Sequence, residues 1–488
     1  MTAAASRRRT RLRWWVSIAA VVLLGISVLV AVNRPRPQER PNIVVVMTDD
    51  QTVEQMQALP AVADLAREGA VSGTNLAAYP LCCPSRATYL TGQYPHNHGV
   101  QGNHEPVGGY YRLDGSRTLP VWLRDAGYHT AHIGKYLNEY GTRQPTEVPP
   151  GWTEWYGAVD PSTYRYFDYR LNENGRTVHY GNRPEEYQSD VYTRKAVDFV
   201  HRRGTSEQPF FLSLAYLAPH SGFPSRGRCA DSAHPAPRHA GDFRDAVLPR
   251  PPSFDEPDVS DKPQSVAGLP RLGPEAVERI TRDYQCRRES LLAVDEGVRE
   301  LVGALRETGE LDRTLIVFTS DNGFFQGEHR VPKSKFKPYE SSVRVPLVLR
   351  GPGVPPGTRI EGLTANVDLA PTLLDAAGAE PGHVVDGRSL LPVLAGRERL
   401  DHRAVLLENG PDDGRRNPQY DAVRTDRYVY VEYATGEREL YDLRLDPHQL
   451  RSAHADPAHA PVRDALAGAL AALRDCSGAS CRVDAAVP

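Results

Sequence analysis

A run of β-branched residues near the start of the chain is the feature that most restricts the fold. Residues 42–48 read Asn-Ile-Val-Val-Val-Met-Thr and offer no polar side chain between Ile43 and Met47. Such a run is typical of a strand that is buried on both faces, as in parallel sheets with helices on either side. The run stops at the acidic pair Asp49 and Asp50, so the predicted strand presents two carboxylates at its carboxyl end.

The alternation of strand and helix patterns continues through most of the chain. It predicts an α/β fold in which helices cover both faces of a sheet. The further predicted strands are 129–133, 210–216, 314–320 and 345–349, and the predicted helices are 120–126, 189–202 and 274–308.

Two other stretches set the expected domain organisation. Residues 221–272 are rich in Pro, Arg, Asp and His without periodicity, which indicates a long irregular insertion. After about residue 401, short strands precede a helix at 458–474, so we expect a small α+β C-terminal subdomain. The predicted division is an N-terminal segment of residues 1–40, a main domain of residues 41–400 and a C-terminal subdomain of residues 401–488.

The N-terminal segment has the composition of a targeting element. Five arginines between residues 7 and 13 precede an almost uninterrupted apolar stretch at 14–32, which is long enough to cross a bilayer. No small-x-small cleavage site follows this stretch, which favours a retained signal anchor over a cleaved signal peptide. We therefore expect residues 14–32 to anchor the protein in a membrane, or to be removed from a secreted protein. Everything after Pro41 is expected outside the cytoplasm.

Charge and cysteine usage bear on the possible partners and on the compartment. The 488 residues include 58 basic and 61 acidic side chains, a formal charge of −3, so nucleic acid is not expected as a partner. Disulfides form outside the cytoplasm, and Cys476 and Cys481 are spaced as a short-loop bridge. Cys229 and Cys286 could form a second bridge.

Polar residues follow four of the predicted strands directly. In α/β sheets, ligands bind beyond the carboxyl ends of the strands, so these residues are the first candidates for a site. Three carboxylates and an amide are hard oxygen ligands that suit Ca²⁺ or Mg²⁺ better than zinc. Taken singly, an acidic pair is more often a helix cap, and Asp-Asn-Gly is more often a turn. Together they predict a binding cleft, formed by Asp49, Asp50, Lys135, His220, Asp321 and Asn322.

The most informative stretch reads Leu-Cys-Cys-Pro-Ser-Arg-Ala-Thr-Tyr-Leu-Thr-Gly at residues 81–92. Pro84 suits the first turn of a helix, which places Cys82 at an N-terminus where backbone N–H groups favour an anion. Neighbouring cysteines bridge each other only with strain, so a disulfide does not explain Cys82 and Cys83. Cys82 is therefore either a nucleophile that meets an anionic substrate or a buried structural cysteine.

This stretch resembles the sulfatase signature Cys-x-Pro-Ser-Arg followed by Thr-Gly, in which the first cysteine is oxidised to formylglycine. Further phrases typical of the family are Gly134-Lys135, Ser320-Asp321-Asn322-Gly323, Asp368-Leu369-Ala370-Pro371-Thr372 and Asp386-Gly387-Arg388-Ser389-Leu390. The resemblance covers the chain from Pro41 to the C-terminus. It implies an alkaline-phosphatase/sulfatase-like mixed sheet between helices, with the sulfatase catalytic domain at residues 41–400.

Within the family, the chain looks most like the N-acetylglucosamine-6-sulfatase branch, which acts on heparan and keratan sulfate. The phrases that carry this likeness are Tyr94-Pro95-His96-Asn97-His98, Gly134-Lys135-Tyr136-Leu137-Asn138-Glu139-Tyr140-Gly141 and Cys476-Ser477-Gly478 with Cys481. After Asn322-Gly323, however, Phe324 and Phe325 stand where many members have Tyr-His.

The resemblance also implies roles for individual residues. Cys82, as 3-oxoalanine (formylglycine) made by a formylglycine-generating enzyme, is the nucleophile near a Ca²⁺ ion, and His220 protonates the leaving oxygen. Lys135 and Lys335 neutralise the sulfate oxygens, Lys333 and Lys337 being the alternatives to Lys335. Arg86 reaches back toward the nucleophile. The implied metal ligands are Asp49, Asp50, Cys82, Asp321 and Asn322.

The predicted function is therefore removal of the 6-O-sulfate from N-acetylglucosamine-type sugars in sulfated glycans. One rival is another hydrolase of the same superfamily, an arylsulfatase or a phosphonate or phosphodiester hydrolase, because one metal cleft serves several tetrahedral oxyanions. The other is a catalytically silent protein of the same fold that captures sulfated glycans without cleaving them.

Overall fold

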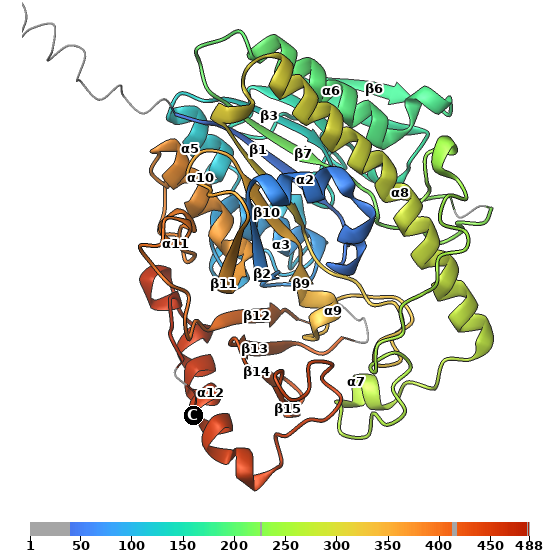
Figure 1. Ribbon diagram of the computed structural model, residues 1–488, viewed down its shortest axis with the longest axis vertical. Helices are drawn as coiled ribbons and strands as arrows, with labels where there is room; N and C mark the ends of the chain where they lie inside the picture. Colours follow the sequence, from blue (N-terminus) through green and yellow to red (C-terminus); the bar gives the residue numbers. More distant parts are fainter. Residues whose placement is uncertain (1–39, 225–226, 412–416, 486, 488) are drawn as a thin grey trace, which may run out of the picture. The chain divides into compact units, whose positions relative to one another are not determined.

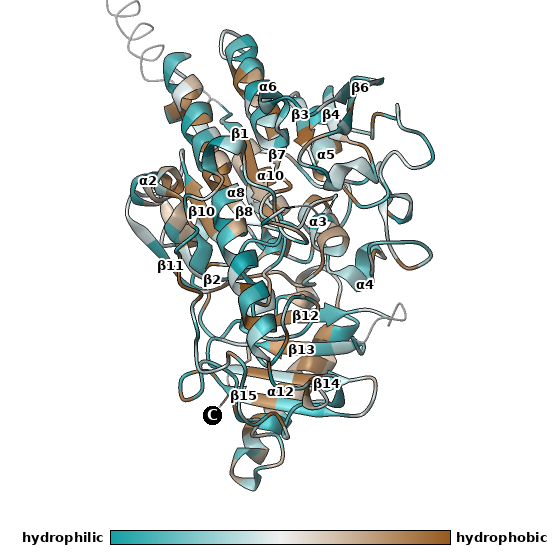
Figure 2. Ribbon diagram, turned by 90° about the vertical axis from the view of Figure 1, so that its right-hand side faces the viewer, coloured by the Kyte–Doolittle hydropathy of each residue, from teal (hydrophilic) through white to brown (hydrophobic). Residues whose placement is uncertain are grey.

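The computed structural model describes residues 40–224, 227–411, 417–485 and 487 (Figure 1). The predicted membrane anchor at 14–32 lies outside these ranges. Within them, no helix is both long enough and apolar enough to span a bilayer. The longest helix, α8 (Pro274–Glu307), is polar along much of its length, as its teal colour shows (Figure 2).

Strand β1 (Asn42–Thr48) lies inside a mixed sheet of eleven strands in the described part of the chain. It pairs in parallel with β7 (Phe210–Ala215) on one side and with β8 (Thr314–Ser320) on the other. All seven of its residues are buried, which confirms the prediction of a strand covered on both faces. The carboxyl ends of these three parallel strands share one edge of the sheet.

The remaining strands extend the sheet on both sides of this parallel centre. On one side lie β3 and β4, then the antiparallel hairpin of β5 and β6, and on the other side β10, β2 and β11, with β9 paired to β2. Their bounds are β2 Ala70–Leu76, β3 His129–Gly134, β4 Glu154–Ala158, β5 Tyr169–Glu173, β6 Arg176–Tyr180, β9 Arg344–Val345, β10 Leu347–Arg350 and β11 Thr358–Ala365.

Helices cover both faces of the sheet, as predicted (Figure 1). Side chains alternate along a strand, so Val44 and Val46 of β1 pack with one helical layer, and Ile43 and Val45 with the other. The first layer contains α2 (Pro60–Glu68), α6 (Gln188–Arg203) and α8, and the second contains α3 (Cys82–Thr91), α5 (Leu119–Asp125) and α10 (Leu369–Ala377). The short helices are α4 (Pro95–His98), α7 (Gln264–Ala267), α9 (Glu340–Val343) and α11 (Leu391–Leu394).

The C-terminal part forms a separate four-stranded antiparallel sheet with one helix. The strands are β12 (Val405–Asn409), β13 (Tyr420–Arg424), β14 (Tyr428–Tyr433) and β15 (Arg438–Asp442), and α12 (Ala460–Arg474) packs against them. Glu439 of β15 is fully buried and accepts a hydrogen bond at 2.8 Å from the hydroxyl of Tyr339, which precedes α9. This bond links the C-terminal sheet to the rest of the protein. This arrangement confirms the expected α+β C-terminal subdomain.

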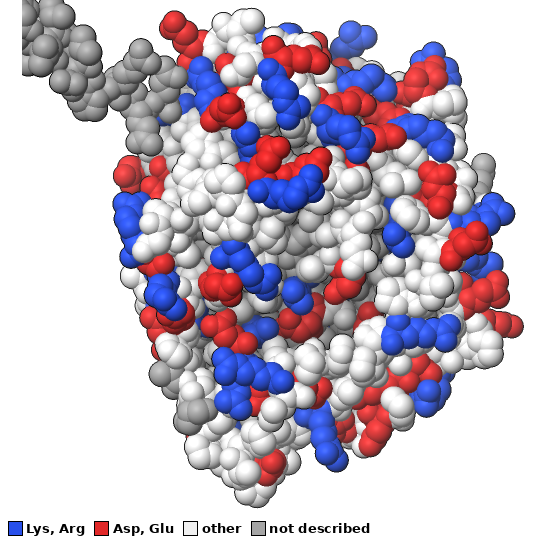
Figure 3. Space-filling model, in the orientation of Figure 1, with Lys and Arg blue, Asp and Glu red and all other residues white. Residues whose placement is uncertain are grey.

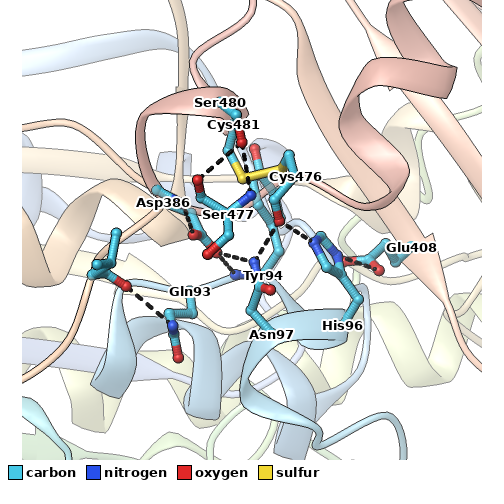
Figure 4. Close-up of a disulfide and its surroundings, with 12 residues drawn as sticks. Gln93, Tyr94, His96, Asn97, Asp386, Glu408, Cys476, Ser477, Ser480 and Cys481 are labelled. Atoms are coloured by element: carbon cyan, nitrogen blue, oxygen red, sulfur yellow. Dashed lines mark hydrogen bonds and ion pairs between the residues drawn. A yellow bond between two sulfur atoms is a disulfide. The ribbon is translucent and has the colours of Figure 1, made fainter.

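Both proposed disulfides form, Cys229–Cys286 and Cys476–Cys481. Around the second, the carbonyl oxygen of Cys476 lies 2.9 Å from His96 Nε2 and accepts from Asn97 Nδ2 at 2.8 Å (Figure 4). The C-terminal loop is thereby fastened to α4, which directly follows the helix that begins at Cys82.

Asp386 joins the same two segments with a buried carboxylate. It accepts hydrogen bonds from the backbone N–H of Tyr94 and of Gly478, both at 2.7 Å, and from Asn97 Nδ2 at 2.9 Å (Figure 4). We expect Asp386→Ala to lower the free energy of unfolding by about 2–5 kcal/mol, because it leaves buried donors without an acceptor. Urea denaturation followed by circular dichroism measures this change.

The matched control for that prediction is Asp401→Ala, which removes an exposed carboxylate paired with Arg399 on the surface. Its effect should stay within about 0.5 kcal/mol. An equal loss of the free energy of unfolding in the two variants would show that the buried hydrogen bonds of Asp386 add no stability beyond that of a surface ion pair.

Candidate active site

The residues predicted from strand ends meet at one place, at the carboxyl edge of the parallel strands. Asp49 and Asp50 follow β1, and Asp321 and Asn322 follow β8. Lys135 follows β3, and its backbone N–H bonds to the last residue of β7. All five are buried in the described structure.

Helix α3 supplies the remaining central residue from its first position. Leu81 is extended at the N-cap and Cys82 begins the helix, as the position of Pro84 predicted. Cys82 is 1% exposed, and its Sγ lies 3.6 Å from Asp49 Oδ1 and 2.9 Å from Lys335 Nζ. The sulfur therefore lies between a carboxylate and an ammonium group at the mouth of a helix.

Arg86 lies one helical turn beyond Cys82 on the same face of α3. Its Nε donates to Asp321 Oδ2 at 2.8 Å, and a terminal nitrogen lies 3.4 Å from Asp49 Oδ2. Another terminal nitrogen donates to the Lys135 carbonyl at 2.8 Å. The guanidinium thus holds the ends of β1, β3 and β8 together beneath the cysteine.

The acidic residues form a donor set that fits a hard divalent cation. Asp50 adopts φ of 67°, a left-handed conformation uncommon outside glycine, and accepts from Asn322 Nδ2 at 2.6 Å. Asn322 Oδ1 is buried and has no hydrogen-bond partner within the described ranges, so this oxygen is available as a ligand. Ligand atoms of Asp49, Asp50, Cys82 and His220 lie within 4.8 Å of one another. Carboxylate and amide oxygens are the ligands that Ca²⁺ takes.

Burial and charge set the protonation of the central groups. Burial raises the pKa of Cys82 to about 12, and the Asp49 carboxylate acts in the same direction. Burial acts to raise the pKa of Asp49, but the positive charges of Lys135, His220, Arg86 and Lys335 together outweigh burial and hold that pKa below its usual value. Since the thiolate is the reactive form of cysteine, the unmodified Cys82 thiol is a poor nucleophile here.

His220 lies at the rim of the same cluster. Its Nε2 is 3.7 Å from Asp50 Oδ2, and its Nδ1 donates to the Ser221 carbonyl at 2.7 Å. Burial lowers the pKa of His220 to about 4, against the raising effect of Asp49 and Asp50.

The structure separates Lys335 from its two neighbouring lysines. Lys335 contacts Cys82 and forms an ion pair with Asp50. Lys333 instead lies with its Nζ 3.4 Å from Asp283 Oδ1 on α8. Burial lowers the pKa of Lys337 to about 8, against the raising effect of Glu439. Of the three candidates, Lys335 is the one placed beside the cysteine.

Two residues at the site escaped the sequence analysis. Arg287 of α8 is fully buried, contacts the Asp50 carbonyl, and donates to the Pro219 carbonyl at 3.0 Å. Tyr164 lies with its ring 4.8 Å from Lys135 Nζ and accepts from Asn138 Nδ2 at 2.6 Å. Neither residue follows a predicted strand or belongs to a motif, so only the folded chain reveals them.

A pocket of about 300 Å³ opens above the cluster. Asp50, His220 and Lys335 form its polar floor, and Phe223, Phe324 and Phe336 provide apolar walls. A charged group can thus reach the cysteine's surroundings while a larger organic group rests against the aromatic side chains.

Comparison with known proteins decides the family. The family model described as Sulfatase matches residues 41–379, and one described as N-sulphoglucosamine sulphohydrolase, C-terminal, matches residues 327–476. The chain belongs to the sulfatase family. It is accordingly a sulfuric ester hydrolase of alkaline-phosphatase/sulfatase-like fold.

This sulfatase resembles proteins that act on sulfated sugars. An N-acetylglucosamine-6-sulfatase of Capra hircus is 33% identical over 94% of this chain and 87% of that protein. A solved structure in complex with its substrate D-glucosamine-2-N,6-O-disulfate has a TM-score of 0.76 and 26% identity, covering 88% of this chain and 97% of that one. The extracellular sulfatase Sulf-1 homolog of Caenorhabditis elegans is 32% identical over 80% of this chain, which spans 54% of that protein's length.

Proposed function

We propose that this sulfatase removes the 6-O-sulfate of N-acetylglucosamine-type sugars in sulfated glycans. The observation that carries the proposal is Cys82 at the first position of α3, between Asp49 and Lys335, because Lys335 also lines the pocket. A substrate sulfate entering this pocket meets the helix N-terminus and the ammonium groups, which favour an anion. The relative named N-acetylglucosamine-6-sulfatase and the structure with bound glucosamine disulfate support this choice of sugar.

We assign two cofactors to the site. Formylglycine derived from Cys82 supplies a hydrated aldehyde as the nucleophile, a role that the buried thiol fills poorly. Ca²⁺ would be held by Asp49, Asp50, Asp321 and Asn322 beside residue 82, where it supplies a Lewis acid that stabilises negative charge on oxygen.

The other residues bind and orient the sulfate and move one proton. Lys135 and Lys335 lie on two sides of the cluster, so their ammonium groups neutralise the sulfate oxygens as charge moves to the leaving oxygen. Arg86 fixes the carboxylates of Asp49 and Asp321 beneath residue 82. His220 faces the pocket and is assigned the proton for the leaving oxygen, because a sulfate ester beside the ring favours its protonated form.

The proposal also includes maturation and location. A formylglycine-generating enzyme is the partner that converts Cys82. The extracellular sulfatase homologue supports an extracytoplasmic location, with residues 14–32 as the membrane anchor.

The mass of the tryptic peptide 68–86 tests the modification directly. We expect formylglycine at position 82 and an unmodified Cys83 in protein from its native host, analysed without a reductant that removes aldehydes. An unmodified Cys82 in active protein would overturn the assignment, and an unmodified Cys82 in inactive protein would favour a silent glycan-binding protein.

Substrate choice is tested with matched esters. We expect hydrolysis of N-acetylglucosamine 6-sulfate to exceed that of the 3-sulfate, an aryl sulfate and a phosphonate monoester by at least about a hundredfold in kcat/KM, since a misplaced ester removes the reacting group from the cluster. Preference for the aryl sulfate or the phosphonate would contradict the assignment to a sugar sulfate.

A further inference from the structure

A second cavity adjoins the active-site pocket beside Lys333. Asp231 and Lys333 line both cavities, so the two cavities lie side by side. That second cavity has a volume of about 430 Å³ and lies between the loop at 227–232 and the face of α8 at 276–283. We call the two together the α8 groove. The space available to a substrate therefore extends past the reacting sulfate.

The walls of the α8 groove are fastened to one another. The disulfide between Cys229 and Cys286 joins the loop to α8. Lys333 Nζ contacts the Asp231 carbonyl on the loop and lies 3.4 Å from Asp283 Oδ1 on the helix. Because these links hold both walls, a ligand pays little to order the groove when it binds.

Basic side chains outnumber acidic ones in the lining of the second cavity, and one of the basic ones, Arg228, forms an ion pair with the buried Glu289 outside that lining. The acidic side chains of the lining are Asp231 and Asp283, whereas its basic ones are Arg228, Arg279, Arg282 and Lys333. Another cavity, of about 680 Å³, adjoins the active-site pocket across Phe324, but it has more acidic than basic side chains: Glu54, Glu328, Glu340 and Asp426 against Arg250, Arg344 and Arg424. Of these two ways out of the pocket, the one along α8 suits an anionic chain.

Two arginines of the α8 groove are available for a ligand. Arg279 and Arg282 are three residues apart and so share one face of α8. Their carboxylate partners, Glu275 and Glu278, lie 3.9 and 3.4 Å away and are 92% and 68% exposed, so these ion pairs hold the arginines weakly. Elsewhere on the face in Figure 3, basic and acidic side chains interleave.

The position of these arginines along α8 relates them to the reaction. Arg287 contacts the Asp50 carbonyl at the active site. At about 1.5 Å per residue, Arg282 and Arg279 lie about 7.5 and 12 Å farther along the helix axis. They therefore lie along α8 at a distance from the active-site cluster.

We propose that the α8 groove binds a second anionic group of the substrate, a sulfate or carboxylate on a neighbouring sugar, through Arg279 and Arg282. This inference rests on the proposed sugar sulfatase function and adds to it that an acidic oligosaccharide is preferred over a single sugar. The guanidinium group suits this role because its planar fork bonds two oxygens of one anion.

The test compares the Arg279→Ala/Arg282→Ala variant with the wild type on three probes. These are the methyl glycoside of N-acetylglucosamine 6-sulfate, a tetrasaccharide that begins with this sugar and continues with anionic sugars, and one that continues with neutral sugars. We expect a loss of about ten- to a hundredfold in kcat/KM on the anionic tetrasaccharide alone, mostly through KM. The control is Arg306→Ala/Arg397→Ala, which removes two exposed arginines from outside the groove. Its kcat/KM on all three probes should equal that of the wild type.

The outcomes separate this inference from the proposed function. Equal kcat/KM values of the double variant and the wild type on the anionic tetrasaccharide would overturn the proposed role of the α8 groove, even if both proteins hydrolyse the monosaccharide. If the wild type hydrolyses none of the probes, the proposed function is wrong. The binding role of the α8 groove is then tested by measuring the affinity for the anionic tetrasaccharide by calorimetry. In that case, tighter binding of the anionic tetrasaccharide by the wild type than by the variant supports it, and equal binding refutes it.

Discussion

Replacing Cys82 by alanine is expected to lower sulfate ester hydrolysis by about 10⁴- to 10⁶-fold while the protein stays folded, because the variant lacks the proposed nucleophile. The fold should tolerate the change, since alanine suits the first turn of a helix and only one buried sulfur is lost. Steady-state kinetics on the 6-sulfated monosaccharide and thermal unfolding followed by circular dichroism measure the two effects.

Cys83→Ala is the matched control for this variant. Cys83 is the next residue of α3, is equally buried, and packs in the hydrophobic core beside Ala87 and Leu90. The same atoms are removed in both variants, so Cys83→Ala should lose some stability and keep most of its turnover. Wild-type turnover in Cys82→Ala would exclude Cys82 as the nucleophile.

Removing Ca²⁺ with a chelator should lower activity by about 10³-fold or more, and added Ca²⁺ should restore it. The proposed ion contributes several kcal/mol of charge stabilisation, and each 1.36 kcal/mol corresponds to about a factor of ten in rate. Full activity in excess chelator would remove Asp49, Asp50, Asp321 and Asn322 from the metal role.

The stability of the protein offers a second measurement of the metal, independent of turnover. A ligand present at a hundred times its Kd stabilises the folded state by about 2.7 kcal/mol, so Ca²⁺ should raise the Tm. Asn322→Ala removes the unpartnered ligand oxygen and should abolish most of this rise. Asn172→Ala, which also removes a buried amide but lies in β5, should keep it. Equal responses of both variants to Ca²⁺ would contradict the assignment of Asn322.

The parts of the fold that could be predicted are those in which local pattern and tertiary environment agree. β1 and β8 are apolar through their middle residues and buried along their whole length, and their bounds match the prediction. β6 (Arg176–Tyr180) lies at the edge of the sheet and none of its residues is buried, so it carries no apolar run. β2 contains Ser72, Gly73 and Thr74, which interrupt the apolar pattern of a strand.

The site was predictable to the extent that its residues follow strands or belong to a motif. Asp49, Lys135 and Asp321 end strands of one sheet, so topology alone brings them together. Arg287 reaches the site from a long helix, and its neighbour Arg288 looks equivalent in the sequence but stacks on Phe243. Which of these two adjacent arginines points into the site depends on which face of α8 packs against the sheet. No short sequence pattern around residues 287 and 288 indicates that face.

The burial of Cys82 has a consequence for timing. A side chain that is 1% exposed, at the start of a helix whose every residue is buried, is out of reach of a second enzyme. The proposed conversion of Cys82 would therefore have to precede the folding of the chain around it, during or soon after synthesis. Purified protein that lacks the aldehyde should then gain no activity from the converting enzyme until it is unfolded, treated and refolded.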